Sequence, residues 1–318
     1  MSQIFSVSAA IDELPTISQF VEEISAAWLE LTGTDVTVSE AVLLVSPTWN
    51  NQEGEEWLED TSYLFYLTNI STRGLEVWCK DGRFHVRVSS LSCQHEWLLA
   101  FDMLAIAGQT DDAVVHTDTP EGVVKLGELR QVFNDEWIAA VIAEHVEKTF
   151  AAIAEGIDKL EFGGPLRPFY FGPWVALRLL SVFPNIEEQY EEMIELIFDM
   201  MRFVQYFFVR PQFVDFEMAD TVTFAVSGSQ VRGALLTHDR HIYFPAVEFL
   251  VLPHPKQGFL ALPAADTKEH LQPILEEIKE VVWLDESQFA VFALDQARLA
   301  EIAEQIAPAC KKVKLTSV

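Results

Sequence analysis

The spacing of apolar residues predicts a helix near the start of the chain. Ile17, Phe20, Ile24 and Trp28 recur at intervals of three and four residues, which places their side chains on one helical face. Thr16 stands directly before this stretch as a candidate N-cap. We therefore expect a helix that buries this face against a core.

Four β-rich runs follow this predicted helix. The third and fourth flank Asp81-Gly82, a dipeptide that favours the tight turn of a β-hairpin. A second helix is expected between Ser92, as its cap, and Gly108, as its end, followed by two short strands and a helix over 134–156. The pattern predicts an antiparallel meander with accompanying helices.

The same order of elements recurs in the second half of the chain. A segment rich in glycine and proline, 161–174, breaks regular structure and predicts a boundary there. We therefore predict an α+β fold of two tandem domains, 1–160 and 161–318, each with a helix, antiparallel sheet, helix order. A long apolar helix is expected at 185–208, in the second domain.

Short matched segments suggest that the two halves arose by internal duplication. Residues 114–132 align with 281–302, and the turns at Asp81 and Asp239 occupy corresponding places. The expectation rests on few identities.

Length and composition indicate a globular protein. The chain has 318 residues, half of them apolar, which suits two domains with proper cores. Its most membrane-like run, 193–209, is interrupted by charged residues. The opening residues lack the basic start of a secretory signal, and the three cysteines are odd in number, so we expect reduced thiols in the cytoplasm.

Negative charge dominates the sequence. The net charge is −28, from 49 acidic and 21 basic residues. Residues 1–160 hold 27 acidic and 8 basic residues, and residues 1–72 hold twelve acidic residues and no basic one. Such an excess opposes binding to nucleic acid or an anionic membrane and leaves a basic protein as the expected partner. Solubility alone is the other interpretation.

A predicted loop at 46–60 combines tryptophans with acidic residues. Exposed, it would anchor a basic protein surface. Alternatively, Trp57 and Leu58 fold back and cap the sheet, and the sequence leaves both interpretations open. The candidate partner-binding residues are Trp49, Glu53, Glu55, Glu56, Trp57, Glu59 and Asp60.

Motifs for catalysis are absent from the sequence. It contains no G-x-S-x-G elbow and no glycine-rich phosphate loop, so we expect no cofactor or metal. His238, Asp239 and His241 form its tightest group of metal-type ligands, and Arg167 lies in the glycine-rich segment. These four are the catalytic suspects if the protein is instead a hydrolase-type enzyme with a site between its domains.

The main expectation is a non-enzymatic protein-binding protein. It would neutralise or chaperone a basic protein partner, in the manner of an immunity protein, through the acidic surface with its tryptophans. A structural subunit of a larger assembly is a further alternative. The sequence leaves the oligomeric state open.

Overall fold

The computed structural model of the chain divides into two compact units. It describes residues 2–33, 36–40, 56–59, 61–186, 188–208, 212–218, 231–244, 247–277, 281–283 and 288–317. The first unit comprises Met1–Phe171 and Leu179–Tyr206, and the second comprises Gly172–Arg178 and Phe207–Val318. The sequence instead predicted a division after residue 160.

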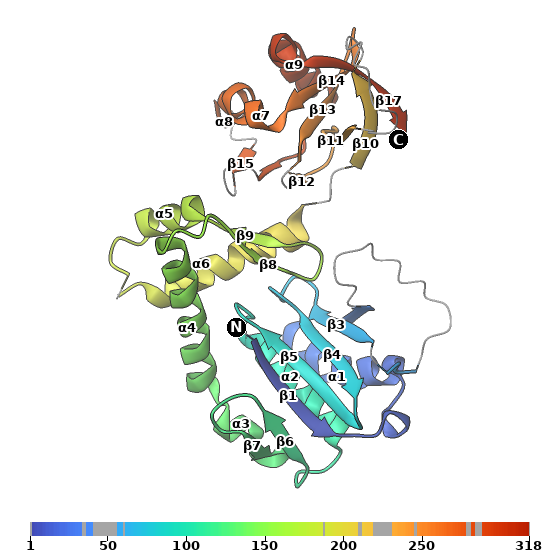
Figure 1. Cartoon of the computed structure of the whole chain (residues 1–318), viewed down its shortest axis with the longest axis vertical. Helices are drawn as coiled ribbons and strands as arrows, with labels where there is room; N and C mark the ends of the chain where they lie inside the picture. The colour runs from blue at the N-terminus through green and yellow to red at the C-terminus, as the bar shows by residue number, and fades with distance from the viewer. Residues whose placement is uncertain are drawn as a thin grey trace. The chain divides into compact units, whose positions relative to one another are not determined.

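A seven-stranded antiparallel sheet forms the centre of the first unit (Figure 1). Its strand order is β2-β3-β4-β5-β1-β6-β7. The strands are β1 (Ser2–Ser8), β2 (Val36–Glu40), β3 (Ser62–Leu67), β4 (Leu75–Lys80), β5 (Arg83–Ser89), β6 (Val114–Thr117) and β7 (Val123–Lys125). The accompanying helices are α1 (Ile17–Thr32), α2 (Gln94–Gly108), α3 (Leu129–Val132) and α4 (Asp135–Ala154), with 3₁₀ turns at Ile11–Glu13 and Leu126–Glu128.

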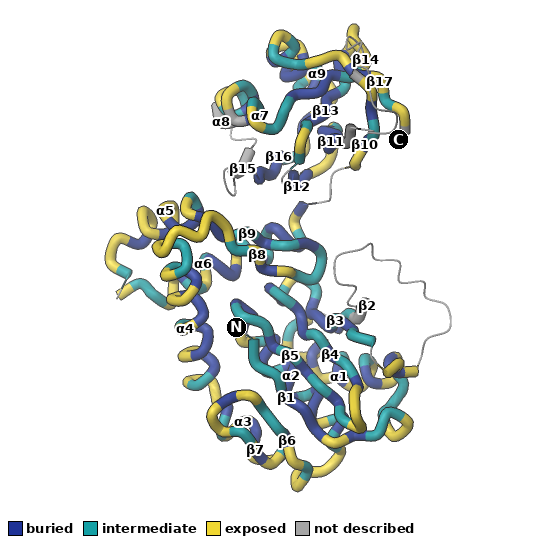
Figure 2. Tube along the Cα trace, viewed as in Figure 1, coloured by how far each residue is buried: buried dark blue, intermediate teal, exposed yellow. Residues whose placement is uncertain are grey.

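Helices α1 and α2 cover one face of this sheet, where the core of the first unit lies. Figure 1 shows both helices behind the strands, and α2 packs against β1 and β5. Phe5 of β1 meets Trp97 and Phe101 of α2 edge to face, with ring centroids 6.2 and 5.7 Å apart. These residues are fully or almost fully buried, and Figure 2 shows buried, dark blue positions alternating with intermediate, teal ones along β4 and β5.

The first predicted helix is confirmed as α1. Ile17, Phe20, Ile24 and Trp28 are all buried. Thr16 caps the helix reciprocally with Gln19: the Gln19 backbone N–H donates to Thr16 Oγ1 at 3.3 Å, and the Thr16 N–H donates to Gln19 Oε1 at 3.1 Å.

The predicted hairpin at Asp81-Gly82 is confirmed as the turn between β4 and β5. Both residues have positive φ, 51° and 68°, as a type I′ turn requires. Its flanking residues Lys80 and Arg83 pair directly across the two strands.

Helix α2 ends at Gly108 as predicted, but its N-cap is Cys93 rather than Ser92. Glu96 lies three residues after Cys93, and its carboxylate accepts a hydrogen bond from the Cys93 N–H at 2.8 Å. Because of this bond, the helix starts one residue later than predicted. The prediction had relied on the preference of serine for N-cap positions.

A hairpin and two helices follow α4 along the chain. Strands β8 (Leu160–Phe162) and β9 (Phe169–Phe171) pair antiparallel. Helix α5 (Pro173–Val182) contributes residues to both units, and α6 (Tyr190–Arg202) belongs to the first.

The apolar helix predicted at 185–208 is shorter than expected. It consists of α6 and a π-helical turn, Phe203–Phe207. Contacts group α6 with the first unit, whereas the sequence predicted this segment in the second domain. Among the described residues, no helix is both long and apolar enough to cross a membrane.

A closed five-stranded barrel and a three-stranded sheet form the second unit. The barrel strands are β10 (Gln212–Met218), β11 (Val231–Leu235), β13 (Phe249–His254), β14 (Gly258–Pro263) and β17 (Lys311–Ser317). The smaller sheet contains β12 (Ile242–Phe244), β16 (Phe289–Val291) and β15 (Val281–Trp283). The helices are α7 (Ala264–His270), α8 (Gln272–Glu277) and α9 (Gln296–Ile306), with a 3₁₀ turn at Ala307–Ala309.

The α+β class is confirmed, but the structure does not show the predicted duplication. The first unit has an open antiparallel sheet, whereas the second has a barrel in which β11 and β13 pair parallel. Asp81 lies in a hairpin, but Asp239 lies between β11 and β12, which belong to different sheets. The two turns share a positive φ at aspartate and not a common strand pairing.

Candidate functional site

The acidic surface predicted around residues 46–60 lies only partly within the described residues. Trp49, Glu53, Glu55 and Asp60 fall outside them. Glu56 and Glu59 are exposed, as the prediction requires. Trp57, in contrast, is only 5% exposed.

Trp57 is a core residue of the first unit. Its indole Nε1–H donates to the Pro15 carbonyl oxygen at 2.9 Å. Its ring stacks on Phe65 and meets Phe20 and Phe84 edge to face, with centroids 5.4 to 6.0 Å apart. Trp57 is therefore unavailable as an exposed anchor in this structure. Its burial fits the interpretation in which it folds back onto the sheet, although the neighbouring Leu58 is 58% exposed.

The catalytic suspects divide between the two units, with His238, Asp239 and His241 in the second and Arg167 in the first. His238 and Asp239 are exposed, with His238 Nε2 and Asp239 Oδ2 3.4 Å apart. His241 Nδ1 accepts a hydrogen bond from the Ala293 N–H at 3.1 Å. Arg167 belongs to the first unit, where Gln205 accepts from its backbone N–H at 3.0 Å. Within the part of the chain that the structure describes, no three His, Cys, Asp or Glu side chains are placed to hold a metal ion.

The most organised polar group in the first unit surrounds the buried carboxylate of Glu96. It accepts hydrogen bonds from Thr72 Oγ1 and the Cys93 N–H, both at 2.8 Å, from the Arg73 N–H at 2.9 Å, and from the Gly74 N–H. We call these five residues the Glu96 cluster. It joins the start of α2 to the loop before β4.

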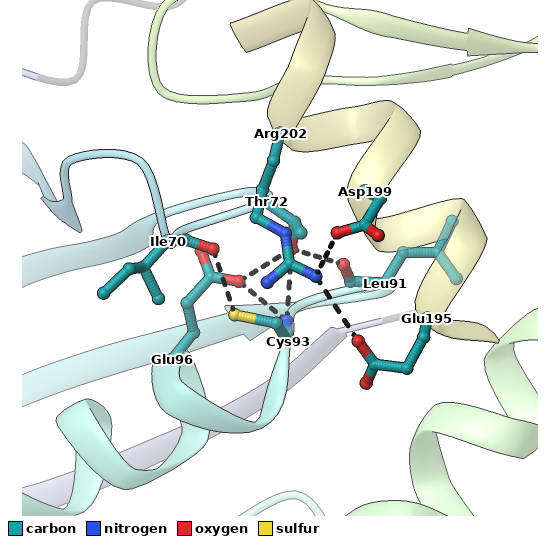
Figure 3. Close-up of polar contacts among 8 residues, drawn as sticks. All are labelled: Ile70, Thr72, Leu91, Cys93, Glu96, Glu195, Asp199 and Arg202. Atoms are coloured by element: carbon teal, nitrogen blue, oxygen red, sulfur yellow. Dashed lines mark hydrogen bonds and ion pairs between the residues drawn. The ribbon is translucent and has the colours of Figure 1, made fainter. Parts of the chain in front are cut away.

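Arg202 of α6 lies beside this cluster. Figure 3 shows its guanidinium near Cys93, with Nη2 paired to Asp199 at 3.1 Å and to Glu195 at 3.4 Å. The Cys93 thiol donates to the Ile70 carbonyl oxygen at 3.6 Å. Burial raises the pKa of this thiol, which disfavours the thiolate that a nucleophilic cysteine needs. The Glu96 cluster and Arg202 therefore stabilise the fold and do not activate Cys93 as a nucleophile.

An open groove lies between the start of α1 and the end of α2. Its volume is about 710 Å³. Its lining combines three larger apolar side chains, Leu14, Pro15 and Ile106, with two acidic ones, Glu13 and Glu23. The complete lining is Glu13, Leu14, Pro15, Gln19, Glu23, Ala105, Ile106 and Gln109. We call it the α1–α2 groove.

A smaller pocket continues from this groove. The two share Ala105 and Gln109, and the pocket has a volume of about 200 Å³. It adds two acidic residues, Asp102 and Asp111, and one basic residue, Arg130. Its lining is Phe101, Asp102, Ala105, Gln109, Thr110, Asp111, Leu126, Gly127, Leu129 and Arg130. Arg130 Nη2 lies 2.5 Å from Asp102 Oδ1, so this ion pair offsets the charge of Asp102, and Asp111 adds a further carboxylate to the pocket.

Hydrogen bonds between its walls fix the shape of the groove. Gln109 ends α2 in a left-handed conformation, with φ of 61°, and its Nε2 donates to the Glu13 carbonyl oxygen at 3.3 Å. The hydrogen bond from the Trp57 indole to the Pro15 carbonyl oxygen fixes Pro15, which lines the groove. These contacts preorganise the groove in the absence of a ligand.

The potential of the groove is negative. Glu13, Glu23 and Asp111 are exposed. The first basic residue of the sequence is Arg73, so the α1 wall contributes no positive charge. The carboxyl end of α2 adds the partial negative charge of a helix C-terminus. The arrangement favours a cationic ligand over an anionic one.

The sequence pattern did not single out this groove. Its acidic residues lie at helix ends and in turns, where no periodicity marks them, and its two walls are some ninety residues apart in sequence. The one signal that pointed toward it was the absence of basic residues before Arg73.

Comparison with protein-family models, with curated proteins and with solved structures found no match to this chain.

Proposed function

We propose that this protein is a non-enzymatic binding protein that takes a basic segment of a partner protein in the α1–α2 groove. The observation that supports the proposal is the placement of Glu13 and Glu23 in the lining of the groove, beside Leu14, Pro15 and Ile106, and of Asp111 in the adjoining pocket. Neutralising or chaperoning a basic partner, as an immunity protein does, is the activity this binding would serve.

The apolar side chains in the lining explain why a peptide segment fits better than a free cation. Lysine and arginine side chains have long aliphatic stems, which lie along apolar surface while the charged end reaches a carboxylate. Such a surface is offered by Leu14, Pro15 and Ile106, which line the groove together with its acidic residues. A small inorganic cation would make no favourable contact with these apolar side chains.

The fixed walls of the groove support binding with little ordering cost. A site that is already shaped loses less conformational entropy when it is occupied. The bonds from Gln109 to Glu13 and from Trp57 to Pro15 hold both sides in place.

Calorimetric titration with a ten-residue peptide of alternating lysine and alanine tests the proposal. The variant Glu13→Gln/Glu23→Gln/Asp111→Asn removes the three carboxylates while keeping side-chain size. Because an exposed ion pair contributes up to about 1 kcal/mol, we expect the peptide to bind the variant about thirtyfold more weakly at an ionic strength of about 0.1 M.

A matched control separates the groove from the general charge of the protein. Glu147→Gln/Glu155→Gln/Asp158→Asn changes the net charge equally, and these residues are exposed on or just after α4. The control should bind the peptide within about twofold of wild type, since exposed charges beyond a Debye length of about 10 Å are screened. Equal weakening in both variants would show that only overall charge attracts the peptide.

A further inference from the structure

The smaller pocket beside the α1–α2 groove has the size of a site for one side chain. Its volume is about 200 Å³, and it adjoins the groove at Ala105 and Gln109, which line both. Sites that take a whole small molecule are larger, at about 300 to 1,000 Å³. A segment bound in the groove could therefore place one of its side chains in this pocket, which we call the Asp111 pocket.

Backbone hydrogen bonds fix the turn that presents Asp111. The Gly127 N–H donates to the Asp111 backbone carbonyl oxygen at 2.9 Å, and the Leu126 N–H donates to the Ala113 carbonyl oxygen at 2.8 Å. Gly127 permits this close approach because it lacks a side chain: a Cβ at this position would lie 3.0 Å from the Asp111 Cβ. The backbone that carries the Asp111 carboxylate is therefore in place before a ligand binds.

The Asp111 pocket has a net charge of −1. Its charged residues are two acidic ones, Asp102 and Asp111, and one basic one, Arg130. Arg130 pairs with Asp102 at 2.5 Å. Lys125, the basic residue closest to Asp111 in sequence, pairs with Asp112 at 3.2 Å. Because both basic residues are bound to other carboxylates, one further cation would balance the charge of the pocket.

Arginine matches the groups that line this pocket better than lysine does. Its planar guanidinium carries five N–H donors and can bind a carboxylate through two parallel hydrogen bonds, whereas lysine has a compact and strongly hydrated ammonium. Besides Asp111, the lining includes the Thr110 hydroxyl and the Gln109 amide, whose oxygens can accept further bonds. Phe101 and Leu126 add apolar surface for an aliphatic stem.

We propose that the Asp111 pocket takes an arginine side chain of the basic segment that binds in the α1–α2 groove. The inference rests on the proposed function and adds a preference within it: at one position of the segment, arginine binds more tightly than lysine. The guanidinium pairs with the Asp111 carboxylate, and the aliphatic stem passes Ala105 and Gln109, where pocket and groove adjoin.

The presence of Arg130 does not make the pocket a site for an anion. Its guanidinium is bound to Asp102, which also accepts a hydrogen bond from the Trp28 indole N–H at 3.1 Å. An anion in the pocket would approach the Asp111 carboxylate and the carboxyl end of α2, and both repel negative charge.

Two ten-residue peptides of equal charge test the proposal by calorimetric titration of the full chain. One alternates lysine and alanine, and the other has arginine in place of the central lysine. Wild type should bind the arginine peptide at least about threefold more tightly, because the guanidinium makes a second charge-assisted hydrogen bond. In Asp111→Asn the ratio of the two affinities should fall to about one, since the carboxylate that accepts both bonds is gone.

Glu128→Gln is the matched control. It removes a carboxylate from the turn that bonds to Asp111, but Glu128 is exposed and does not line the pocket. The preference for the arginine peptide should therefore remain at least about threefold. General attraction to the acidic protein cancels in this ratio because the two peptides have the same charge. Both substitutions replace exposed carboxylates with amides of similar size, and thermal unfolding shows that each variant is folded.

Two kinds of result would overturn the proposal. Equal affinities of wild type for the two peptides, or an arginine preference that survives in Asp111→Asn, would remove the Asp111 pocket as an arginine site and leave the groove as a site for basic segments in general. Absence of binding by both peptides would overturn the proposed function and, with it, this inference.

Discussion

Trp28 of α1 donates a hydrogen bond from its indole Nε1 to Asp102 Oδ2 of α2, at a distance of 3.1 Å. The other carboxylate oxygen of Asp102 pairs with Arg130. Asp102 thus links α1, α2 and α3 at the pocket that continues the α1–α2 groove. The acidic groove and the packing of the two helices depend on the same side chain.

Replacing Asp102 with alanine should therefore destabilise the first unit. The change leaves the buried Trp28 indole N–H without its acceptor, which costs about 1 to 3 kcal/mol of unfolding free energy. Urea denaturation measures the effect. Asp112→Ala, which removes a carboxylate that is 91% exposed, is the control and should change the unfolding free energy by less than about 0.5 kcal/mol. Equal effects from both would contradict a structural role for Asp102.

Replacing Glu96 with alanine should have a larger effect. The carboxylate accepts hydrogen bonds from Thr72 and from three backbone N–H groups, and its loss leaves the Arg73 and Gly74 N–H groups without this acceptor. We expect a loss of at least about 3 kcal/mol in unfolding free energy. The exposed Glu128→Ala provides the comparison in the same denaturation assay, and a Glu96→Ala loss as small as that of Glu128→Ala would be inconsistent with this cluster.

Trp57→Ala should destabilise the protein as a core substitution does. Loss of this buried ring and its contacts with Phe20, Phe65 and Phe84 costs about 3 to 5 kcal/mol. The neighbouring Glu56→Ala should be nearly neutral because Glu56 is exposed. Calorimetric melting temperatures distinguish the two. A Trp57→Ala protein as stable as Glu56→Ala would contradict the burial of Trp57 in the core.

His145 makes stability depend on pH in a defined direction. Its side chain is 3% exposed, and burial lowers its pKa to about 4 from an ordinary value of 6.5. The unfolded chain takes up the proton near pH 6.5 while the folded chain does not. The stability associated with neutral His145 is therefore complete above about pH 6.5 and falls as the pH drops toward 4.

The variant His145→Leu isolates this contribution. Wild type should lose about 2 kcal/mol more unfolding free energy than His145→Leu between pH 7 and pH 5, since each pKa unit corresponds to about 1.4 kcal/mol. Denaturation at the two pH values measures the difference. Parallel losses in the two proteins would mean that His145 titrates normally in the fold. His238→Leu, an exposed control, should behave as wild type does.

Local elements were predictable from the sequence because their signals are local. The apolar face of α1, with Thr16 as its cap, and the Asp81-Gly82 turn each depend on a few neighbouring residues. The N-cap of α2 was misplaced by one residue because Glu96 also bonds to the distant loop of Thr72 and Arg73.

Long-range arrangements were not predictable in this way. Closure of β10 on β17 joins residues about a hundred positions apart, and the parallel pairing of β11 with β13 leaves no mark in either strand. Likewise, Trp57 stands among acidic residues in sequence, and only the position of Phe20, Phe65 and Phe84 shows that it is buried. The groove was missed because its walls meet only in the folded unit.

Hydrogen exchange of the full chain, with and without the lysine-alanine peptide, tests the central claim most directly. Occupation of the α1–α2 groove should slow amide exchange in 13–23 and 105–111, while 83–89, strand β5, exchanges as before. Protection spread evenly over the exposed acidic elements, or absent from 13–23 and 105–111 at saturating peptide, would contradict the groove as the binding site.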